Sequence, residues 1–500
     1  MGIKNKGLIN IHHLNQEQIL HILNLAAELK SALNRKKPED YKLGRGKDIL
    51  LARLFYENST RTRASFEIAG QRLGFNITGF DSTEGSSVKK GESLVHTLDM
   101  FDAYQADVLV LRHPLDGAAK VASNRLQIPV FNAGDGKHQH PTQTILDLFT
   151  IIEHTGRLDN LEVGLSGDLK YGRTVHTLAL ALSLFSNNTI HLYSPSNLPM
   201  PPNIIGLLEE RNTKVIHHDK LETMVPDLDI FYQTRIQKER MPDPFEYEKA
   251  KKGGIFNAHC MELTKDGFGL MHPLPIDKSL PGIEPALDIH PKSIYKMQAG
   301  NGVPTRMALL ALSLGLAKDL PAKSSHEEQI IDHFYKELPI RKTPPKKEVS
   351  IRPIRERGVV IDHMIPYSER LLSILLNVAD KQNAYRAATV RSVSRPDNLK
   401  GMLMIENRRL TKEELHLVAT LSPGARVNNI TDAQVTKKLQ LSLPRLIEGI
   451  NELRCPNVSC ITRPRHQEHI SPRFEKIGSE TLQCSYCGHV VSSQELFNHI

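Results

Sequence analysis

Hydroxyl, amide and guanidinium groups gather in the segment Glu-Asn-Ser-Thr-Arg-Thr-Arg at 57–63, between a strand-like run and a helical run that Gly74 can terminate. At the start of a helix, free backbone N–H groups and the positive end of the helix dipole favour an anion. The segment therefore predicts a phosphate site made by Ser59, Thr60, Arg61 and Thr62. Taken alone, Ser-Thr-Arg favours a Ser/Thr helix cap beside surface arginines.

Two further segments favour the phosphate site over the cap. Arg112 ends the strand-like run Asp-Val-Leu-Val-Leu-Arg, and His140 precedes Pro141, a residue typical of a first helical turn. Gln143 follows within the same predicted turn. Strand ends and helix starts lie on the face where parallel α/β sheets bind ligands, so we expect these side chains to meet there.

Four of the five cysteines form two close pairs in a short C-terminal segment: Cys455, Cys460, Cys484 and Cys487. Four thiolates suit tetrahedral zinc with no open position, which predicts one structural Zn²⁺ per chain. We interpret the nearby histidines as surface residues: His466, His469 and His489. Cys260 stands apart and receives no role. A basic zinc ribbon could instead contact nucleic acid, but this third has no Trp and no interleaved aromatic and basic residues.

Alternating strands and helices must position these residues. A helix is predicted at 16–34 after an Asn15 cap. Strand-like runs alternate with helical ones, at 49–56, 107–111, 128–133, 161–166, 189–193 and 228–234. This order predicts an α/β protein with two doubly wound parallel-sheet domains. A small α+β domain follows, with strands near 359–364, 387–393 and 401–406 and helices at 368–379 and 411–420, and then a zinc-ribbon-like β domain.

The predicted boundaries are residues 1–150, 151–303, 321–347 (a linker), 348–448 and 449–500, with a helix at 304–320 that returns to the first domain. The net charge differs on the two sides of residue 320.

Residues 1–320 hold 37 Lys/Arg and 36 Asp/Glu, whereas residues 321–500 hold 27 Lys/Arg and 20 Asp/Glu. A composition with 40% hydrophobic and 24% charged residues excludes a disordered or fibrous chain. We find neither a signal peptide nor an apolar run of about 18 residues, so we expect a cytoplasmic protein without membrane contact.

The motifs Ser-Thr-Arg-Thr-Arg, Arg-His-Pro, Gly-Asp-Gly-Lys-His-Gln-His-Pro-Thr-Gln-Thr and His-Pro-Leu-Pro resemble the carbamoyltransferase family over essentially residues 1–320, and in detail its aspartate enzymes. The resemblance implies a carbamoyl-phosphate-binding and then an aspartate-binding domain. It assigns the phosphate to Ser59, Thr60, Arg61, Thr62 and Arg112. It assigns the carbonyl oxygen to Thr62, Arg112 and His140, and the carbamoyl NH₂ to Gln143 and the backbone carbonyls of Leu274 and Pro275.

By the same resemblance, Ser86 and Lys90 belong to a loop that reaches into a neighbouring subunit's site, where Lys90 contacts both substrates. This implies a homo-oligomer that is at least a trimer and could be a larger assembly. No metal or organic cofactor is needed for the chemistry, because the leaving phosphate can accept the amine proton.

The second substrate is expected to be L-aspartate, giving N-carbamoyl-L-aspartate and phosphate in pyrimidine synthesis. Two carboxylates need two cationic clamps, which Arg173 and Arg235 supply, assisted by Gln237 and Lys90. Ornithine enzymes of the family carry an acidic residue and a Cys-Leu-Pro loop here. Another carbamoyltransferase and a non-catalytic zinc-ribbon binding protein are the alternatives. One departure is Ile276, where Arg is common in the family.

Residues 348–500 resemble the regulatory chain of aspartate carbamoyltransferase, normally a separate polypeptide. Asp362, His363 and Lys438 match its nucleotide-effector site. Met404 replaces an expected second lysine, and the aromatic expected near Ala433 is absent. Losing one phosphate-binding charge removes about 1–3 kcal/mol. We therefore hypothesise weak or absent nucleotide regulation, with the domain retained for assembly.

Overall fold

The structure, a computed structural model, describes residues 5–238, 241, 243–251, 254–280, 282–318, 320, 334–340, 354–378, 384–391, 399–450, 452–492 and 495–496. The chain divides into two compact units, Met1–Ser325 and His326–Ile500. Among the helices described, none combines the length and the apolar character that crossing a membrane requires.

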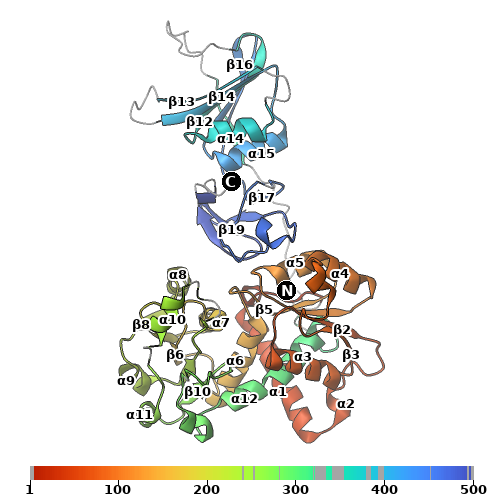
Figure 1. The fold of residues 1–500 in the computed structure, drawn as a ribbon, viewed down its shortest axis with the longest axis vertical. Helices are drawn as coiled ribbons and strands as arrows, with labels where there is room; N and C mark the ends of the chain where they lie inside the picture. Colours follow the sequence, from red (N-terminus) through yellow and green to blue (C-terminus); the bar gives the residue numbers. More distant parts are fainter. Residues whose placement is uncertain are drawn as a thin grey trace. The chain divides into compact units, whose positions relative to one another are not determined.

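The first unit begins with a five-stranded parallel sheet (Figure 1). Its strands, in spatial order, are β1 (Gly7–Leu8), β5 (Val130–Asp135), β4 (Val108–His113), β2 (Leu50–Phe55) and β3 (Asn76–Phe80). Three of these, β2, β4 and β5, lie where the apolar runs predict strands. Their burial on both faces explains the continuous apolar sequence.

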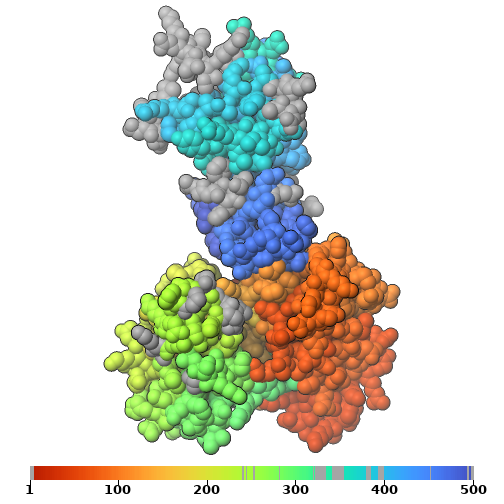
Figure 2. Space-filling model, viewed as in Figure 1, coloured from red at the N-terminus to blue at the C-terminus, as the bar shows by residue number. Residues whose placement is uncertain are grey.

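A second parallel sheet follows in the same unit. Its spatial order is β10 (Gly269–Met271), β9 (Ile230–Gln233), β6 (Glu162–Ser166), β7 (Thr189–Tyr193) and β8 (Lys214–His217). The two sheets confirm the predicted pair of doubly wound α/β domains. Figure 2 shows the two halves of this unit, red to orange and yellow to green, as separate lobes of surface.

Helices separate and cover the strands of both sheets. They are α1 (Gln16–Arg35), α2 (Pro38–Tyr41), α3 (Thr60–Leu73), α4 (Leu94–Ala103), α5 (Ala118–Arg125), α6 (Pro141–Thr155), α7 (Arg173–Leu182), α8 (Pro202–Glu210), α9 (Leu221–Met224), α10 (Pro244–Ala250), α11 (Ala258–Glu262), α12 (Tyr295–Gly300) and α13 (Gly302–Ser313). Helix α1 begins as expected at Asn15, which forms a capping box with Gln18. Gly74 ends α3 in the left-handed conformation, with φ of 91°.

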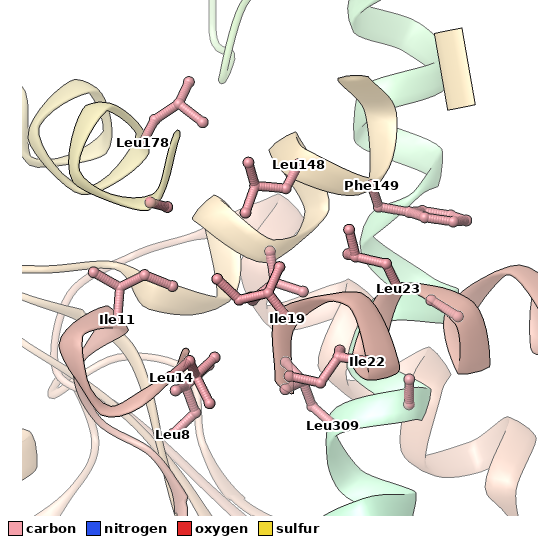
Figure 3. Packing of buried hydrophobic residues seen from close by; sticks show 14 of the residues in the cluster. Leu8, Ile11, Leu14, Ile19, Ile22, Leu23, Leu148, Phe149, Leu178 and Leu309 are labelled. Atoms are coloured by element: carbon pink, nitrogen blue, oxygen red, sulfur yellow. The ribbon is translucent and has the colours of Figure 1, made fainter. Parts of the chain in front are cut away.

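The core of the first unit joins its two ends. Helix α13 packs against α1 and α3, so the last helix of the unit returns to the first domain. In Figure 3, Ile19 and Leu23 of α1 lie beside Leu148 of α6, and Leu309 of α13 lies below them. All four side chains are at most 2% exposed, so helices from both ends of the unit share one apolar core.

The second unit contains a six-stranded antiparallel sheet and a smaller four-stranded one. The larger has the order β11 (Tyr335–Glu337), β16 (Gln434–Leu441), β15 (Arg426–Thr431), β12 (Arg357–Met364), β14 (Leu399–Glu406) and β13 (Tyr385–Arg391). Helices α14 (Ser368–Leu375) and α15 (Lys412–Leu421) supply part of the same apolar core as this sheet. The smaller sheet has β17 (Leu446–Ile447), β18 (Phe474–Lys476), β19 (Thr481–Cys484) and β20 (Val490–Ser492).

The predicted linker at 321–347 lies mostly outside the described residues. Where it is described, it differs from the prediction, because Tyr335–Glu337 forms β11 and pairs antiparallel with β16. The neighbouring Phe334 is 3% exposed and belongs to the apolar core of the second unit. One buried aromatic therefore anchors a strand inside a segment whose charge and prolines are typical of a linker.

Candidate functional site

Three helices of the first unit begin at the carboxyl ends of strands without a side-chain cap. Helix α3 follows β2, α6 follows β5 and α7 follows β6, and their N-cap residues Ser59, His140 and Gly172 make no capping hydrogen bond. The explanation of Ser59 as an ordinary helix cap is therefore wrong. At these strand ends each helix presents the positive end of its dipole, which favours a bound anion.

Two arginines from different halves of the unit meet at Gly134. Arg112 of β4 donates from Nη1 to the Ala133 carbonyl at 3.0 Å. Arg173, at the start of α7, donates to the Gly136 carbonyl. A Cβ atom on Gly134, whose φ is 114°, would lie 2.6 Å from Arg173 Nη2 and 2.8 Å from Arg112 Nη1. Only glycine fits, and its absence of a side chain brings two guanidinium groups together.

His140 lies beside this arginine pair and is buried. Its Nε2 is 3.3 Å from the hydroxyl of Thr62 on α3. Burial, and then the nearby Arg173 and Arg112, hold the pKa of His140 well below its usual value. The imidazole is therefore neutral at pH 7, the form in which one ring nitrogen donates and the other accepts.

The His-Pro-Leu-Pro segment forms a tight loop directly after β10. Leu274 has a positive φ of 55°, which is unfavourable for a branched side chain. Its N–H donates to Nδ1 of His272 at 2.8 Å, which holds the loop closed. Burial, and then Arg61 and Arg235, lower the pKa of His272 to about 3. The Arg61 and Arg235 guanidinium groups therefore both lie close enough to His272 to lower its pKa.

Gln143, on α6, donates through Nε2 to Asp147 at 2.9 Å. Asp147 is fully buried, and its pKa is raised to about 7 by that burial, against hydrogen bonds from Gln298, Tyr232 and Gln143. Sequence reasoning missed Asp147 and Gln298. The spacing of Gln143 and Asp147, four residues apart on one helix, is the signal that could have indicated the pair.

Arg235 and Gln237 follow β9 and lie where the second sheet ends. Arg235 lines a pocket together with Ser166, Gly167 and Thr234 at the ends of β6 and β9. The backbone N–H of Gln237 donates to Asp168 at 3.2 Å. Asp168 also accepts from the Tyr171 N–H at 2.9 Å, so one buried carboxylate connects the Arg235 segment to the turn that carries Arg173. Sequence reasoning missed Asp168.

Ile276 packs against the apolar cluster of the second half, which includes Phe256 and Leu287. This partial burial gives the uncharged side chain of Ile276 a structural role.

Ser86 and Lys90 lie apart from the other candidates. Lys90 ends a short 3₁₀ helix, Ser87–Lys90, and is exposed, while Ser86 bonds locally to the Thr83 carbonyl at 2.8 Å. Within the described residues, neither side chain has a hydrogen bond or ion pair to another candidate residue. The structure of one chain therefore does not bring this pair into the site.

The four cysteines of the smaller sheet form a buried cluster. Their sulfur atoms all lie within 4.8 Å of one another. The Cys455–Cys487 and Cys460–Cys484 separations are 3.6 Å and 3.8 Å. Sulfurs bound tetrahedrally at about 2.3 Å from one zinc ion lie about 3.8 Å apart, so the donors fit a four-thiolate metal site. The three neighbouring histidines are not among these possible ligands.

The candidate effector residues lie on the larger sheet of the second unit. Asp362 forms an ion pair with Lys400 at 2.8 Å, and its carboxylate lies 2.9 Å from Nδ1 of His363. Lys438 lies on β16, in a row of directly paired residues that continues through Asn428, Val360, Met404 and Arg386. Directly paired residues share one face of a sheet, so Lys438 and Met404 face the same side. Met404 is 7% exposed and packs with Ile354 and Ile430.

Comparisons with known proteins identify the family to which the first unit is similar. Residues 6–153 match the carbamoyl-P binding domain of aspartate/ornithine carbamoyltransferase, and residues 159–313 match its Asp/Orn binding domain. The aspartate carbamoyltransferase catalytic subunit of Thermococcus onnurineus is 48% identical over 317 residues, which are 63% of this chain and 99% of the relative. The chain belongs to the aspartate/ornithine carbamoyltransferase family.

Solved structures of the family agree. The catalytic subunit of Methanocaldococcus jannaschii aspartate transcarbamoylase is 45% identical with a TM-score of 0.56, covering 61% of this chain and 96% of that one. The Trypanosoma cruzi enzyme in complex with carbamoyl phosphate and aspartate is 32% identical with a TM-score of 0.58, covering 62% and 98%.

The second unit matches the other component of this family. Residues 349–442 match the allosteric domain of the aspartate carbamoyltransferase regulatory chain, and residues 445–497 match its metal binding domain. Catalytic and regulatory components are thus fused in one polypeptide, as the sequence motifs predict.

Proposed function

We propose that the chain is an aspartate carbamoyltransferase that converts carbamoyl phosphate and L-aspartate to N-carbamoyl-L-aspartate and phosphate, a step of pyrimidine synthesis. The observation that carries the proposal is the meeting of Arg112 and Arg173 at Gly134, where three uncapped helices begin. The relatives named above are curated or solved as this enzyme.

Carbamoyl phosphate binds with its phosphate at the start of α3. Its donors there are Ser59, Thr60, Arg61, Thr62 and Arg112. Its carbonyl oxygen faces Thr62, Arg112 and His140, and its NH₂ group faces Gln143 and the carbonyls of Leu274 and Pro275. The 3.3 Å approach of His140 to Thr62 supports placing both at one oxygen.

The aspartate amine attacks the carbonyl carbon, and the bond from that carbon to the phosphate oxygen then breaks. Negative charge develops on the carbonyl oxygen and is stabilised by Arg112, Thr62 and the neutral His140. The departing phosphate takes the amine proton. The protein supplies orientation and charge stabilisation for this sequence.

L-Aspartate binds between the two halves of the first unit, with its carboxylates held by Arg173 and Arg235 and with Gln237 beside them. The Asp168 hydrogen bonds that connect these segments support a shared site. Ser86 and Lys90 act in a neighbouring subunit, which makes the active enzyme at least a trimer. Their separation from the other candidates in one chain supports this arrangement.

The cysteine cluster, Cys455, Cys460, Cys484 and Cys487, holds one structural Zn²⁺. Nucleotide regulation through Asp362, His363 and Lys438 is weak or absent, because buried Met404 occupies the position in the row of Lys438 where a second lysine is expected.

The proposed reaction is tested by offering carbamoyl phosphate with L-aspartate, L-ornithine or other amines and identifying the carbamoylated product by mass spectrometry. Carbamoyl-aspartate should form with a kcat/KM at least a hundredfold above that for any other amine, since paired arginines select a dicarboxylate. Preferred turnover of ornithine would replace the proposal by the alternative carbamoyltransferase. No turnover with any amine would favour a binding protein on an inactive scaffold.

A further inference from the structure

Asp147 lies at the centre of a buried hydrogen-bond network on α6. Its Oδ1 accepts from Gln143 Nε2 at 2.9 Å and from Gln298 Nε2 at 2.7 Å, and its Oδ2 accepts from the Tyr232 hydroxyl at 2.9 Å. These partners come from α6, α12 and β9. One carboxylate therefore joins elements that carry different parts of the candidate site.

The hydrogen bond to Asp147 determines which end of the Gln143 amide faces the ligand. In this arrangement Asp147 accepts from the NH₂ group of the Gln143 amide, so the amide turns its carbonyl oxygen the other way. Without that anchor, the amide can rotate and present its own NH₂ to the ligand. Two NH₂ groups facing each other supply no acceptor, so the orientation decides whether Gln143 can recognise an N–H donor.

Gln298 connects Asp147 to the His-Pro-Leu-Pro loop, so Asp147 also influences the position of that loop. While its Nε2 donates to Asp147, its Oε1 accepts from the backbone N–H of His272 at 2.9 Å. His272 in turn accepts from the Leu274 N–H through Nδ1 at 2.8 Å. The positions of the Leu274 and Pro275 carbonyls thus depend on a chain of bonds that begins at Asp147.

We propose that Asp147 is a positioning residue that fixes all three acceptors of the carbamoyl NH₂ group: the Gln143 amide oxygen and the Leu274 and Pro275 carbonyls. The inference rests on the proposed function and assigns to Asp147 the discrimination of an NH₂ group from an isosteric methyl group. Asp147 is 0% exposed, so it acts through these neighbours and touches no substrate.

The test compares three ligands that differ only where Asp147 acts. Carbamoyl phosphate carries the NH₂ group, acetyl phosphate carries a methyl group in its place, and inorganic phosphate lacks both. Dissociation constants of all three are measured by titration calorimetry on the full-length chain and on the variants Asp147→Leu, Asp147→Asn and Gln298→Met. Thr150→Val is the matched control, because Thr150 is also buried on α6 and bonds Asn301 at 3.0 Å, outside this network.

Asp147→Leu should reduce the preference for carbamoyl over acetyl phosphate by about tenfold to a hundredfold, with unchanged affinity for inorganic phosphate. Asp147→Asn should keep most of the preference, because its amide oxygen accepts from both glutamines while its NH₂ faces the Tyr232 oxygen. Gln298→Met should cause a smaller loss, because only the loop carbonyls are released. Thr150→Val should lower the melting temperature without changing the ratio.

A folded Asp147→Leu variant that keeps the wild-type ratio would overturn the assignment, as would an equal loss for inorganic phosphate. If Asp147→Leu does not fold, an unchanged ratio in Gln298→Met has the same force. These failures are distinct from failure of the proposed function, which would show as a wild-type chain with no preference for carbamoyl over acetyl phosphate.

Discussion

The two units of the chain build their candidate sites by opposite means. In the first, side chains far apart in sequence, such as Arg112 and Arg173, meet because one ends strand β4 of the first parallel sheet and the other follows strand β6 of the second. In the second, the metal ligands are paired locally and the effector candidates lie across the face of an antiparallel sheet. The order and direction of the strands are enough to place the site of the first unit. The effector site on the sheet face also depends on how the strands are paired and on every residue in the row of Lys438.

The largest effect is expected at the metal centre, because binding of structural zinc contributes on the order of 10 kcal/mol to folding. Cys460→Ser should release the metal and abolish the native structure around β17–β20, while aspartate turnover by the first unit persists. Metal content by atomic emission and turnover by product assay check this. Cys260→Ser is the control and should retain metal. Loss of all turnover in Cys460→Ser would contradict the independence of the two sites.

The next largest effect is expected at the start of α3. Arg61→Ala should lower kcat/KM for carbamoyl phosphate about a thousandfold, because a cationic donor to the phosphate is lost. Steady-state kinetics at saturating aspartate measure it. Arg72→Ala, on the last turn of the same helix, is a matched control that should leave kinetics near wild type. An equal loss in both variants would mean that helix stability, rather than the strand-end site, is responsible.

A smaller and more selective effect is expected at the end of β9. Arg235→Ala should raise KM for aspartate about a hundredfold by removing one charge-assisted carboxylate contact, with little change in KM for carbamoyl phosphate. Varying one substrate at a time separates the two constants. Unchanged aspartate kinetics would remove Arg235 from the aspartate site.

The sheet-face site should respond weakly to nucleotides. Titration of ATP, CTP and UTP should not shift the aspartate saturation curve of the wild-type chain. Met404→Lys should restore about tenfold tighter nucleotide binding, since it adds one phosphate-binding charge in the row of Lys438. Met402→Lys, two residues earlier on β14, is the control. A clear shift of the wild-type curve would refute the hypothesis of weak regulation.

The smallest effect is expected from pH, because His140 should not change its protonation state between pH 6 and 8. The pKa of His140 is lowered by burial and by neighbouring arginines, so the neutral imidazole is present above that low pKa and is lost only well below pH 6.5. The pH profile of kcat between pH 6 and 8 should therefore show no step from His140. A step near pH 6.5 that disappears in His140→Asn would show that the imidazole is solvated.

Much of the first unit was predictable because strand polarity fixes where Arg112, His140 and Arg173 must lie. The carboxylates that hold Gln143 and the turn before Arg173 were missed, because Asp147 and Asp168 resemble any surface carboxylate until their burial is known. Strand β11 escaped prediction for a related reason: it depends on one aromatic side chain, Phe334, entering a distant core. The row of Lys438 and Met404 requires the pairing register, which no periodicity in the sequence specifies.

Gly134 carries no functional group, yet its substitution should be tolerated as poorly as that of either arginine beside it. A side chain there would strain a backbone whose φ is 114°, and its Cβ would lie within 3 Å of both guanidinium groups, so the two arginines would have to move. Gly134, the smallest residue of the site, thus limits which substitutions the enzyme tolerates. Changes at Arg235 or in the loop after β10 can alter the amine that is used. Position 134 must remain glycine.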